Sequence, residues 1–292
     1  MNQYGNTIRI IGVQPVAAVP VRRHTALEAG SSKKSTIWVA RLCARLSLWV
    51  PRGIVYCAQK AREVHVGLGY DDRKSRVIYN GYDLSQFSAD DEGRRRLRKE
   101  WDVADDEVLL GMVGRFDPQK DHPNLFGALA ELKGKGHAVR CALVGKGLDR
   151  ANASLKGSIT GFGLSLDREL LLLGQRNDIS TVMNALDIHV LSSAYGEAFP
   201  NVLAEAMACG TPCVTTDVGD AALIVGKTGW VVPPRDGKSL AHSIRSAIKL
   251  SQDQPGWKVR QMACRKRIDA EYSIERMVCA YRDVWEGQSG LI

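Results

Sequence analysis

Apolar positions follow two different patterns along the chain, and the change falls near residue 108. Beyond it, short apolar runs alternate with segments whose apolar residues recur every three or four positions. Such runs are typical of buried strands, and the wider spacing is typical of helices packed on one face. The pattern predicts strands at residues 108–113, 139–144, 170–173, 188–191, 213–216 and 230–232, and helices between them at 124–135, 179–185, 200–208 and 239–250. This alternation predicts an α/β fold with a parallel sheet and helices on both faces.

The region before residue 108 holds fewer elements. Its pattern predicts strands at 7–13, 53–58 and 76–79 and helices at 35–49, 59–68 and 90–101, with a proline-containing link after the first strand and a turn at Asn80 and Gly81. About three strand and helix pairs are few for a complete doubly wound domain. A last helix is predicted at 271–286, beyond the sheet.

The predicted helix at 35–49 combines large apolar residues with arginines on another face. Its apolar positions are Ile37, Trp38, Leu42, Leu46 and Trp49, and its arginines are Arg41 and Arg45. A basic helix with aromatic residues can lie on an anionic membrane surface. A helix packed in a domain with its arginines in water is the alternative.

A second basic run lies on the predicted helix at 90–101. It contains Arg94, Arg95, Arg96, Arg98 and Lys99. Because no aromatic residues are interleaved with these charges, we expect a solvated helix face and no nucleic-acid site.

The composition indicates the class of protein and the cellular compartment that we expect for it. The 292 residues suffice for two domains, and a hydrophobic content of 45% supplies a core for each. The net charge of +8 favours an acidic partner, which could be a nucleotide, a phospholipid surface or a nucleic acid. Seven cysteines without a CxxC pair or a metal-ligand spacing indicate reduced thiols in a cytosolic protein. No apolar run approaches the roughly 20 residues of a spanning helix and no signal peptide begins the chain, so we expect a soluble protein, or one bound peripherally to the inner membrane face.

The stretch at 193–220 combines an anion-binding helix start with two carboxylates. Pro200 suits the first position of a helix, and the N–H groups that follow it favour an anion such as a phosphate. Asn201 and Glu205 lie one turn apart on that helix, and Glu197 stands in the loop before it. This arrangement could hold a sugar, a diphosphate and a ribose. The alternative is an ordinary strand–helix unit with solvated glutamates.

Two further loops follow predicted strands. After the first regular strand, Gly114 allows close backbone approach, and Arg115 and Lys120 could neutralise a diphosphate leaving group. The loop after residue 173 contains Arg176 and Asp178; Asp178 is a good helix N-cap, or the loop backbone could contact a nucleotide base. The sequence contains no complete dinucleotide fingerprint and no Walker motif.

These motifs together carry a family resemblance. Gly114-Arg115 with Gln119-Lys120-Asp121, then Gly174 with Arg176 and Asp178, then Glu197 and Glu205 with seven residues between them resemble glycosyltransferase family four (group 1). That family comprises retaining sugar-nucleotide transferases of the GT-B fold, which has two Rossmann-like domains. The resemblance covers residues 54–286. It implies no metal and no other cofactor, and attack on the donor sugar from the face that the diphosphate leaves.

The resemblance also implies a role for each site residue. Arg115 and Lys120 should hold the donor diphosphate, with Gly114 beneath them, and Glu205 should bind the ribose hydroxyls. Glu197 should lie against the donor sugar. The loop with Arg176 and Asp178 should lie beside the base, and the helix start should help to bind sugar and phosphate through Phe199, Pro200, Asn201 and Val202.

The front of the chain departs from the family pattern. Only about 80 residues precede the motif at 78–81, so by this resemblance we expect the first strand and helix units of the N-terminal domain to be missing. Residues 20–24 resemble the strand that ends in the acceptor-side histidine, which would be His24. We expect a partial acceptor-side domain at 1–82, a nucleotide-sugar domain at 83–255, and at 256–292 a helical segment that crosses back to the first domain.

The predicted activity is metal-independent transfer of a sugar from a nucleoside-diphosphate sugar to a lipid-linked or polysaccharide acceptor of the cell envelope. One alternative is a catalytically impaired remnant that binds a sugar nucleotide or a partner chain. A second is a GT-B sugar-nucleotide epimerase. The basic balance suits an acceptor at an anionic inner membrane face, and no nucleic-acid partner is expected.

Overall fold

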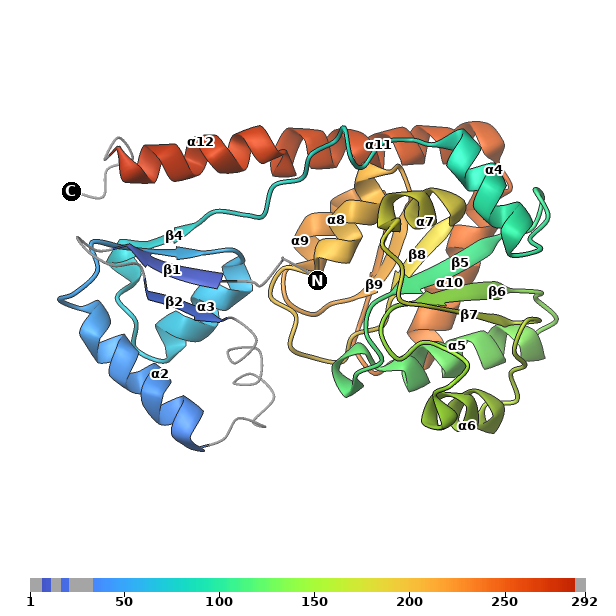
Figure 1. Cartoon of the computed structure of the whole chain (residues 1–292), viewed down its shortest axis with the longest axis horizontal. Coiled ribbons are helices and arrows are strands. Elements are labelled where there is room, and N and C mark those ends of the chain that lie inside the picture. The colour runs from blue at the N-terminus through green and yellow to red at the C-terminus, as the bar shows by residue number, and fades with distance from the viewer. Residues whose placement is uncertain (1–6, 12–16, 21–33, 287–292) are drawn as a thin grey trace.

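The structure, a computed structural model, describes residues 7–11, 17–20 and 34–286 (Figure 1). His24 and most of the segment at 20–24 lie outside these residues, so the acceptor-side role of His24 stays a prediction. In the described part, no helix is both long enough and apolar enough to cross a membrane.

Six parallel strands form the larger of two sheets, in the order β10-β9-β8-β5-β6-β7. The strands are β5 (Leu109–Val113), β6 (Arg140–Val144), β7 (Leu170–Gly174), β8 (Ile188–Leu191), β9 (Cys213–Thr216) and β10 (Trp230–Val232). They are short and mostly buried, as their apolar runs predict. The chain order reverses beside β5, and ligands of open parallel sheets bind at such a point, beyond the carboxyl ends of the strands.

Helices cover both faces of this sheet (Figure 1). They are α4 (Asp91–Glu100), α5 (His122–Gly134), α6 (Ala153–Gly161), α7 (Ile179–Ala185), α8 (Asn201–Ala208), α9 (Ala221–Val225), α10 (Gly237–Ser251) and α11 (Gln254–Tyr272), with single turns η3 (Pro118–Lys120) and η4 (Gly226–Thr228). The last helix, α12 (Ile274–Trp285), extends away from this sheet (Figure 1). Alternate side chains of β5 enter opposite cores. Leu110 packs with Phe126 of α5, and Leu109 shares the other core with Leu203 of α8. Burial of each such side chain stabilises the fold by about 1.5–3 kcal/mol.

The smaller sheet has the strand order β2-β1-β3-β4. Its elements are β1 (Thr7–Ile11), β2 (Ala17–Pro20), α2 (Lys34–Ser47), β3 (Gly53–Tyr56), α3 (Gln59–Gly67), η2 (Asp72–Lys74) and β4 (Ser75–Val77). β3 and β4 are parallel, whereas β1 runs antiparallel to both β2 and β3. The expected link after the first strand therefore contains a second strand. The α/β fold class with two sheets, the N-terminal one small, is confirmed.

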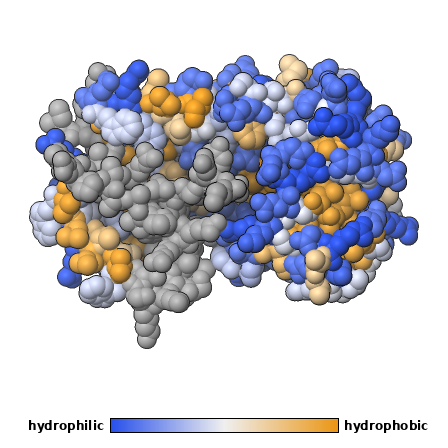
Figure 2. Space-filling view, viewed as in Figure 1, coloured by the Kyte–Doolittle hydropathy of each residue, from blue (hydrophilic) through white to orange (hydrophobic). Residues whose placement is uncertain are grey.

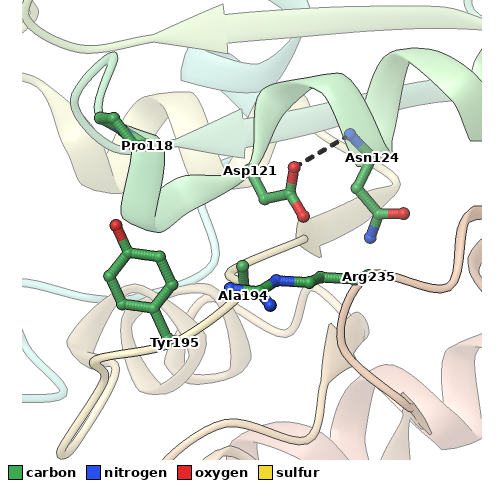
Figure 3. Close-up of a pocket in the computed structure, with 6 residues that line it drawn as sticks. All are labelled: Pro118, Asp121, Asn124, Ala194, Tyr195 and Arg235. Carbon is green, nitrogen blue, oxygen red and sulfur yellow. Dashed lines mark hydrogen bonds between the residues drawn. The ribbon is translucent and has the colours of Figure 1, made fainter. Parts of the chain in front are cut away.

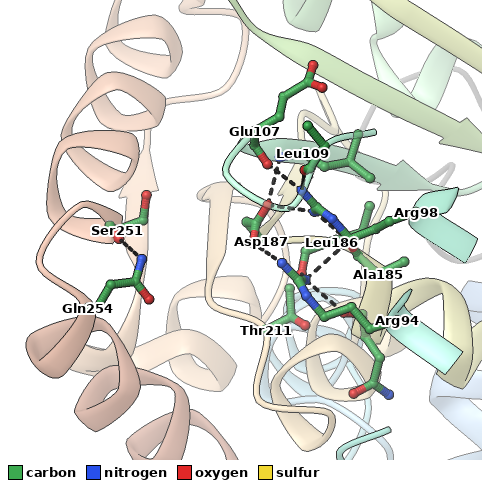
Figure 4. A network of polar contacts seen from close by, with 12 residues as sticks. Arg94, Arg98, Glu107, Leu109, Ala185, Leu186, Asp187, Thr211, Ser251 and Gln254 are labelled. Atoms are coloured by element: carbon green, nitrogen blue, oxygen red, sulfur yellow. Dashed lines mark hydrogen bonds and ion pairs between the residues drawn. The ribbon is translucent and has the colours of Figure 1, made fainter. Parts of the chain in front are cut away.

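Helix α4 is attached to the larger sheet through two arginines (Figure 4). Arg98 and Arg94 donate to the two carboxylate oxygens of Asp187, at 3.0 and 2.6 Å, and Arg98 also donates to three backbone carbonyl oxygens. The predicted solvated face is therefore wrong for Arg94 and for Arg98, whose exposed fraction is 2%. The reason is that these cations meet the carbonyl groups at the end of α7, where a helix favours positive charge. Arg95 and Arg96 are exposed, as expected.

Helix α2 presents its small side chains to the domain. Ala40 and Ala44 are buried, while the large apolar residues Trp38 and Trp49 are 67% and 77% exposed. Val39, Leu42 and Leu46 of α2 are exposed as well, and so are Leu48 and Val50, which lie with Trp49 in the turn after the helix. The alternative of a packed helix with only its arginines in water is wrong on this point, because the large apolar side chains face water too.

The chain passes between the two sheets twice. The first passage is the segment at 78–90, and the second is the junction of α11 with α12, where α12 runs back beside the smaller sheet (Figure 1). The two passages are bonded to each other: Tyr82 N–H donates to Tyr272 O at 2.9 Å, and Ile274 N–H donates to Tyr82 O at 3.1 Å. A Cβ added at Gly81 would lie 2.7 Å from Ile274 Cα, so only glycine fits there.

Candidate functional site

The loops that follow β5 and β8 bring Lys120 and Glu197 together. Lys120 Nζ lies 2.6 Å from Glu197 Oε1, and the side chains are 12% and 11% exposed. Ser193 Oγ donates to the same oxygen at 2.7 Å. The two loops are also joined through Gln119, whose Nε2 donates to Gly196 O at 2.8 Å. The sequence predicts both residues for the site but does not predict the ion pair between them.

Two glycines make room beneath Lys120. The lysine side chain passes over Gly114, where an added Cβ would lie 3.3 Å from Lys120 Cε. Gly145, at the end of β6, has φ of +146°, and a Cβ there would lie 1.8 Å from Gly114 O. Close backbone approach at Gly114, which the sequence predicts, therefore depends on a second glycine on the neighbouring strand.

Arg115 is the less constrained of the two predicted cations. Its side chain is 43% exposed, and Nη2 lies 3.7 Å from Asp117 Oδ2. This separation is too long for a hydrogen bond, so the ion pair holds the side chain weakly. Arg115 is thus available to an anionic ligand at the edge of the site, whereas Lys120 is already paired.

The start of α8 leaves backbone donors unused. Helix α8 begins at Asn201 and Pro200 is its N-cap, so the prediction that Pro200 is the first helical residue is wrong by one position. Pro200 provides no side-chain cap. Within the described residues, the N–H groups of Asn201 and Val202 have no hydrogen-bond acceptor. Unpaired donors at the positive end of a helix favour an anion.

Side chains of the loop before α8 anchor it to the passage between the sheets. Phe199 is 1% exposed and packs against the rings of Tyr79 and Tyr272, with centroids 5.7 and 5.5 Å away. Asn201 Oδ1 accepts hydrogen bonds from Asn80 Nδ2 at 2.8 Å and from Tyr82 OH at 2.6 Å. At these two positions only backbone groups, and the amide nitrogen of Asn201, remain for a ligand.

Glu205 is a half-buried carboxylate with unused acceptor capacity. No side chain or backbone group of the described residues donates to it. Burial raises its pKa from 4.5 to about 7, while the positive charge of Lys120 acts in the opposite direction. An acceptor that is kept from water and has no protein donor is suited to ligand hydroxyl groups.

Arg176 and Asp178 bind each other. Arg176 Nε and Nη2 donate to the two carboxylate oxygens of Asp178 at 2.8 and 2.7 Å, and Nη1 donates to Glu100 at 3.2 Å. The hydrogen bond from Arg176 holds the pKa of Asp178 below its usual value. Asp178 occupies the N-cap position of α7, but its side chain accepts no helix N–H, so the capping prediction is wrong. The two side chains therefore bind each other within the loop, and contact of its backbone with a nucleotide base stays a prediction.

A pocket of about 390 Å³ lies next to Lys120, between the loops after β5, β8 and β10 (Figure 3). It is lined by Pro118, Asp121, Asn124, Ala194, Tyr195 and Arg235. The guanidinium of Arg235 lies 5.9 Å from the ring of Tyr195. Sequence reasoning missed Tyr195 and Arg235. Their only signal is that each follows a predicted strand by a few residues, at the ligand-binding edge of the sheet.

Among the described residues, no group of three or more His, Cys, Asp or Glu side chains is placed to hold a metal ion.

Comparison with known proteins gives the class of this fold and site. Residues 93–262 match the family of "Glycosyl transferases group 1". The chain belongs to this family, and the resemblance found in its motifs is confirmed.

The curated relatives are longer than this chain. It is 31% identical over 214 residues to a D-inositol 3-phosphate glycosyltransferase of Geodermatophilus obscurus, covering 68% of this chain and 45% of that protein. It is 29% identical over 235 residues to an enzyme of the same name from Mycobacterium tuberculosis, covering 79% of this chain and 48% of the relative. The chain thus spans about half the length of the curated relatives it matches.

Solved structures share the fold. HepE of Anabaena in complex with UDP superposes with a TM-score of 0.79 at 24% identity, covering 90% of this chain and 71% of that one. WaaG, a glycosyltransferase involved in lipopolysaccharide biosynthesis, gives 0.65 at 20% identity, covering 79% and 61%. The predicted GT-B fold is confirmed by these likenesses.

Proposed function

We propose that the protein transfers a sugar from a nucleoside-diphosphate sugar to an acceptor hydroxyl and retains the anomeric configuration. The main support is the grouping of Lys120, the unpaired N–H groups of α8 and the unpartnered carboxylate of Glu205 at one edge of the sheet. HepE, a relative in fold, binds UDP and UDP-glucose in its solved structures. A donor of this chemistry has an anionic diphosphate and a ribose diol that match these groups.

In the proposed reaction, the bond between the sugar C1 and the diphosphate oxygen breaks as the acceptor oxygen bonds to C1 on the same face. The acceptor proton passes to the departing phosphate oxygen. Lys120, Arg115 and the N–H groups of Asn201 and Val202 neutralise the charge that develops on the diphosphate. Glu197 contacts the sugar and Glu205 accepts from the ribose hydroxyls.

We assign donor binding and acceptor binding to the two halves of the chain that contain the two sheets. Residues 83–255 bind the donor, residues 1–82 form the acceptor side, and residues 256–292 join the two. The backbone beside Arg176 and Asp178 lies near the base. His24 belongs to the proposed acceptor side.

A lipid-linked acceptor of the cell envelope is supported by helix α2. Figure 2 shows apolar side chains gathered at the end of the molecule that contains α2. Trp38 and Trp49 are exposed there together with Arg41 and Arg45, and no acidic residue occurs from residue 29 to residue 62. Aromatic residues and cations on one surface favour contact with anionic lipid headgroups.

The same surface supports one rival function. Large apolar side chains exposed beside a small sheet suit a remnant that binds a sugar nucleotide and a partner chain but does not turn over. Such a remnant would bind the donor nucleotide sugar but would not catalyse the transfer.

Calorimetry with UDP and GDP, followed by assay of diphosphate release from the corresponding sugars, separates the two. Binding with release in the presence of a lipid-linked acceptor supports the transferase. Binding without release from any donor sugar supports the remnant, and absence of binding to both nucleotides contradicts both.

A vesicle assay tests the acceptor class. The double variant Trp38→Ser, Trp49→Ser should float less with vesicles that contain anionic phospholipid, while binding UDP normally. A matched control is Val259→Ser, Met262→Ser, which removes exposed apolar side chains from α11 instead. Equal flotation of the two double variants would contradict the role of α2.

A further inference from the structure

Asp220 makes contacts in both halves of the molecule. It lies at the N-cap position of α9, beside the larger sheet, and is 2% exposed. Its carboxylate accepts hydrogen bonds from the N–H groups of Gln59 at 2.6 Å and Lys60 at 2.9 Å. These are the first two residues of α3, which packs on the smaller sheet. A buried carboxylate of one half therefore binds the helix N-terminus of the other.

Helix α3 has no cap of its own. Its N-cap residue is Ala58, which has the extended backbone of a cap, with φ of −151° and ψ of 145°, but no side chain that can accept a hydrogen bond. Alanine is among the poorest N-cap residues, and the first N–H groups of a helix need an acceptor when they are buried. Asp220 supplies that acceptor from about 160 positions away in the chain, and its negative charge also suits the helix dipole.

The backbone of Asp220 is bound to the loop that carries Glu197. Asp220 N–H donates to Ala198 O at 2.9 Å. The preceding Gly219 has φ of +64°, and an added Cβ there would lie 2.3 Å from Glu197 O. Residues 219 and 220 are thus pressed against residues 197 and 198. The carboxylate that caps α3 and the carboxylate that pairs with Lys120 are held by one tight backbone contact.

Separation of the two halves would leave Asp220 without its partners. Among the described residues no cation forms an ion pair with it, and burial raises its pKa while the Lys60 and Gln59 N–H groups lower it. A buried carboxylate that loses its donors is strongly unfavourable unless water reaches it. The contact therefore favours the arrangement of the two sheets in which α3 stays bound to Asp220.

We propose that Asp220 is a positioning residue: it caps α3 across the boundary between the sheets and so fixes the Glu197 loop relative to the N-terminal half. The capping contact does not depend on the proposed function. Its expected effect on turnover rests on the proposal that the protein transfers a sugar. Donor binding requires Lys120 and Glu205, which lie in the C-terminal half, so it depends little on the cap. The reaction requires both halves and depends on it.

The first test compares Asp220→Asn with Asp217→Asn. Asp217 lies in the same loop, is exposed, and has no side-chain partner among the described residues, which makes it a matched control. Hydrogen exchange of the peptide that contains Gln59 and Lys60 should become about tenfold faster in Asp220→Asn and should not change in Asp217→Asn. Unchanged exchange in Asp220→Asn would overturn the capping.

Binding and turnover then separate positioning from general stability. In Asp220→Asn, the Kd for UDP and the KM for the donor should stay within about twofold, while kcat falls about tenfold, the effect of one charged hydrogen bond. Loss of UDP affinity as large as the loss of kcat, or faster exchange throughout the protein, would contradict a positioning role. If the unmodified protein binds no nucleotide, the proposed function fails, and the exchange at Gln59 and Lys60 still decides the cap.

A rescue variant completes the design. Ala58→Ser gives α3 an N-cap of its own, since a serine side chain at this position can accept from the helix N–H groups. Combined with Asp220→Asn, it should restore slow exchange in α3 and leave kcat low, because the link to the Glu197 loop is still missing. Recovery of kcat in the double variant would mean that Asp220 only stabilises α3.

Discussion

Lys120 Nζ lies 2.6 Å from Glu197 Oε1, and neither side chain is more than 12% exposed. Lys120 is therefore already paired in the protein without a ligand, whereas Arg115 at the same edge is only weakly held. In the proposed reaction a diphosphate shares Lys120 with Glu197, and Glu197 is in turn positioned by the lysine. Substitution of either residue thus affects two contacts at once.

Lys120→Met should lower the affinity for UDP about 10- to 100-fold, or about 1.5–3 kcal/mol, because a hydrogen bond to a charged group is lost. Affinity for UMP, which lacks the second phosphate, should change far less. Arg115→Ala, which removes a more exposed cation, should cost about tenfold. Calorimetry with both nucleotides checks this, and unchanged UDP affinity in both variants would refute the diphosphate role.

Glu205 should make stability depend on pH. Because its folded pKa is raised from 4.5 to about 7, the folded protein binds more protons than the unfolded chain between these values. The free energy of unfolding therefore decreases as pH rises through this window and becomes level above it. Glu205→Gln should remove this decrease, on the order of 2 kcal/mol, so that the variant is the more stable protein at pH 8. Urea unfolding at pH 5 and pH 8 measures the effect, and parallel changes in both proteins would contradict it.

The same substitution tests the ribose contact. Glu205→Gln should weaken UDP binding more than pyrophosphate binding, because only UDP has ribose hydroxyls to donate to the carboxylate. Competition calorimetry at pH 8, where Glu205 is ionised, gives both affinities. Equal losses for the two ligands would assign Glu205 to something other than the ribose.

Arg98→Met should lower the free energy of unfolding by about 3–5 kcal/mol, because it leaves Asp187 half-paired in a buried network. Arg95→Met on the same helix is the control. Arg95 is exposed, and its loss should change stability by no more than about 0.5 kcal/mol. Urea unfolding of both variants checks the contrast, and similar values for the two would mean that the network contributes little.

Gly145→Ala should disrupt the loop beneath Lys120. The new Cβ would lie 1.8 Å from Gly114 O at a φ that other residues rarely adopt, so the backbone of both strand ends must move. We expect a loss of more than about 2 kcal/mol in stability and weaker UDP binding. Gly157→Ala in α6 is the matched control: nothing lies within 4 Å of its Cβ, and a helical alanine should stabilise by about 0.5–1 kcal/mol. A melting temperature that rises in both variants would contradict the steric conflict.

The sequence predicts the larger sheet well, but its apolar pattern predicts neither α6 nor α9, and it gives α11 only as part of the helical segment at 256–292. β8 and β9 occupy the predicted residues because short apolar or β-branched runs are buried on both faces. α6 contains Gly157 and few apolar residues, and α11 begins with Pro255 and Gly256 and has an irregular apolar pattern, so neither shows helical periodicity. Both helices owe their stability to packing on neighbours that the local sequence does not reveal.

The sequence predicts which residues belong to the candidate site, but it does not predict which of them bind each other. Each stands in the loop after a strand or on the helix that follows it, and the apolar pattern locates these strands. The pairing of Lys120 with Glu197, however, depends on β5 and β8 being neighbours in the sheet. For the same reason the sequence does not indicate that Asp187 would bury two arginines or that Asp220 would reach α3. These partners lie between about 80 and 160 positions apart.

The two passages between the sheets are bonded to each other at one place, where Tyr82 exchanges hydrogen bonds with Tyr272 and Ile274. Because both covalent connections between the halves are held together there, we expect any rotation of one half relative to the other to take place about this point. Movement is then least beside Gly81 and grows with distance from it. In that case the angle between the halves depends on the contact of Asp220 with α3, and the point of rotation depends on Gly81, where an added Cβ would lie 2.7 Å from Ile274 Cα.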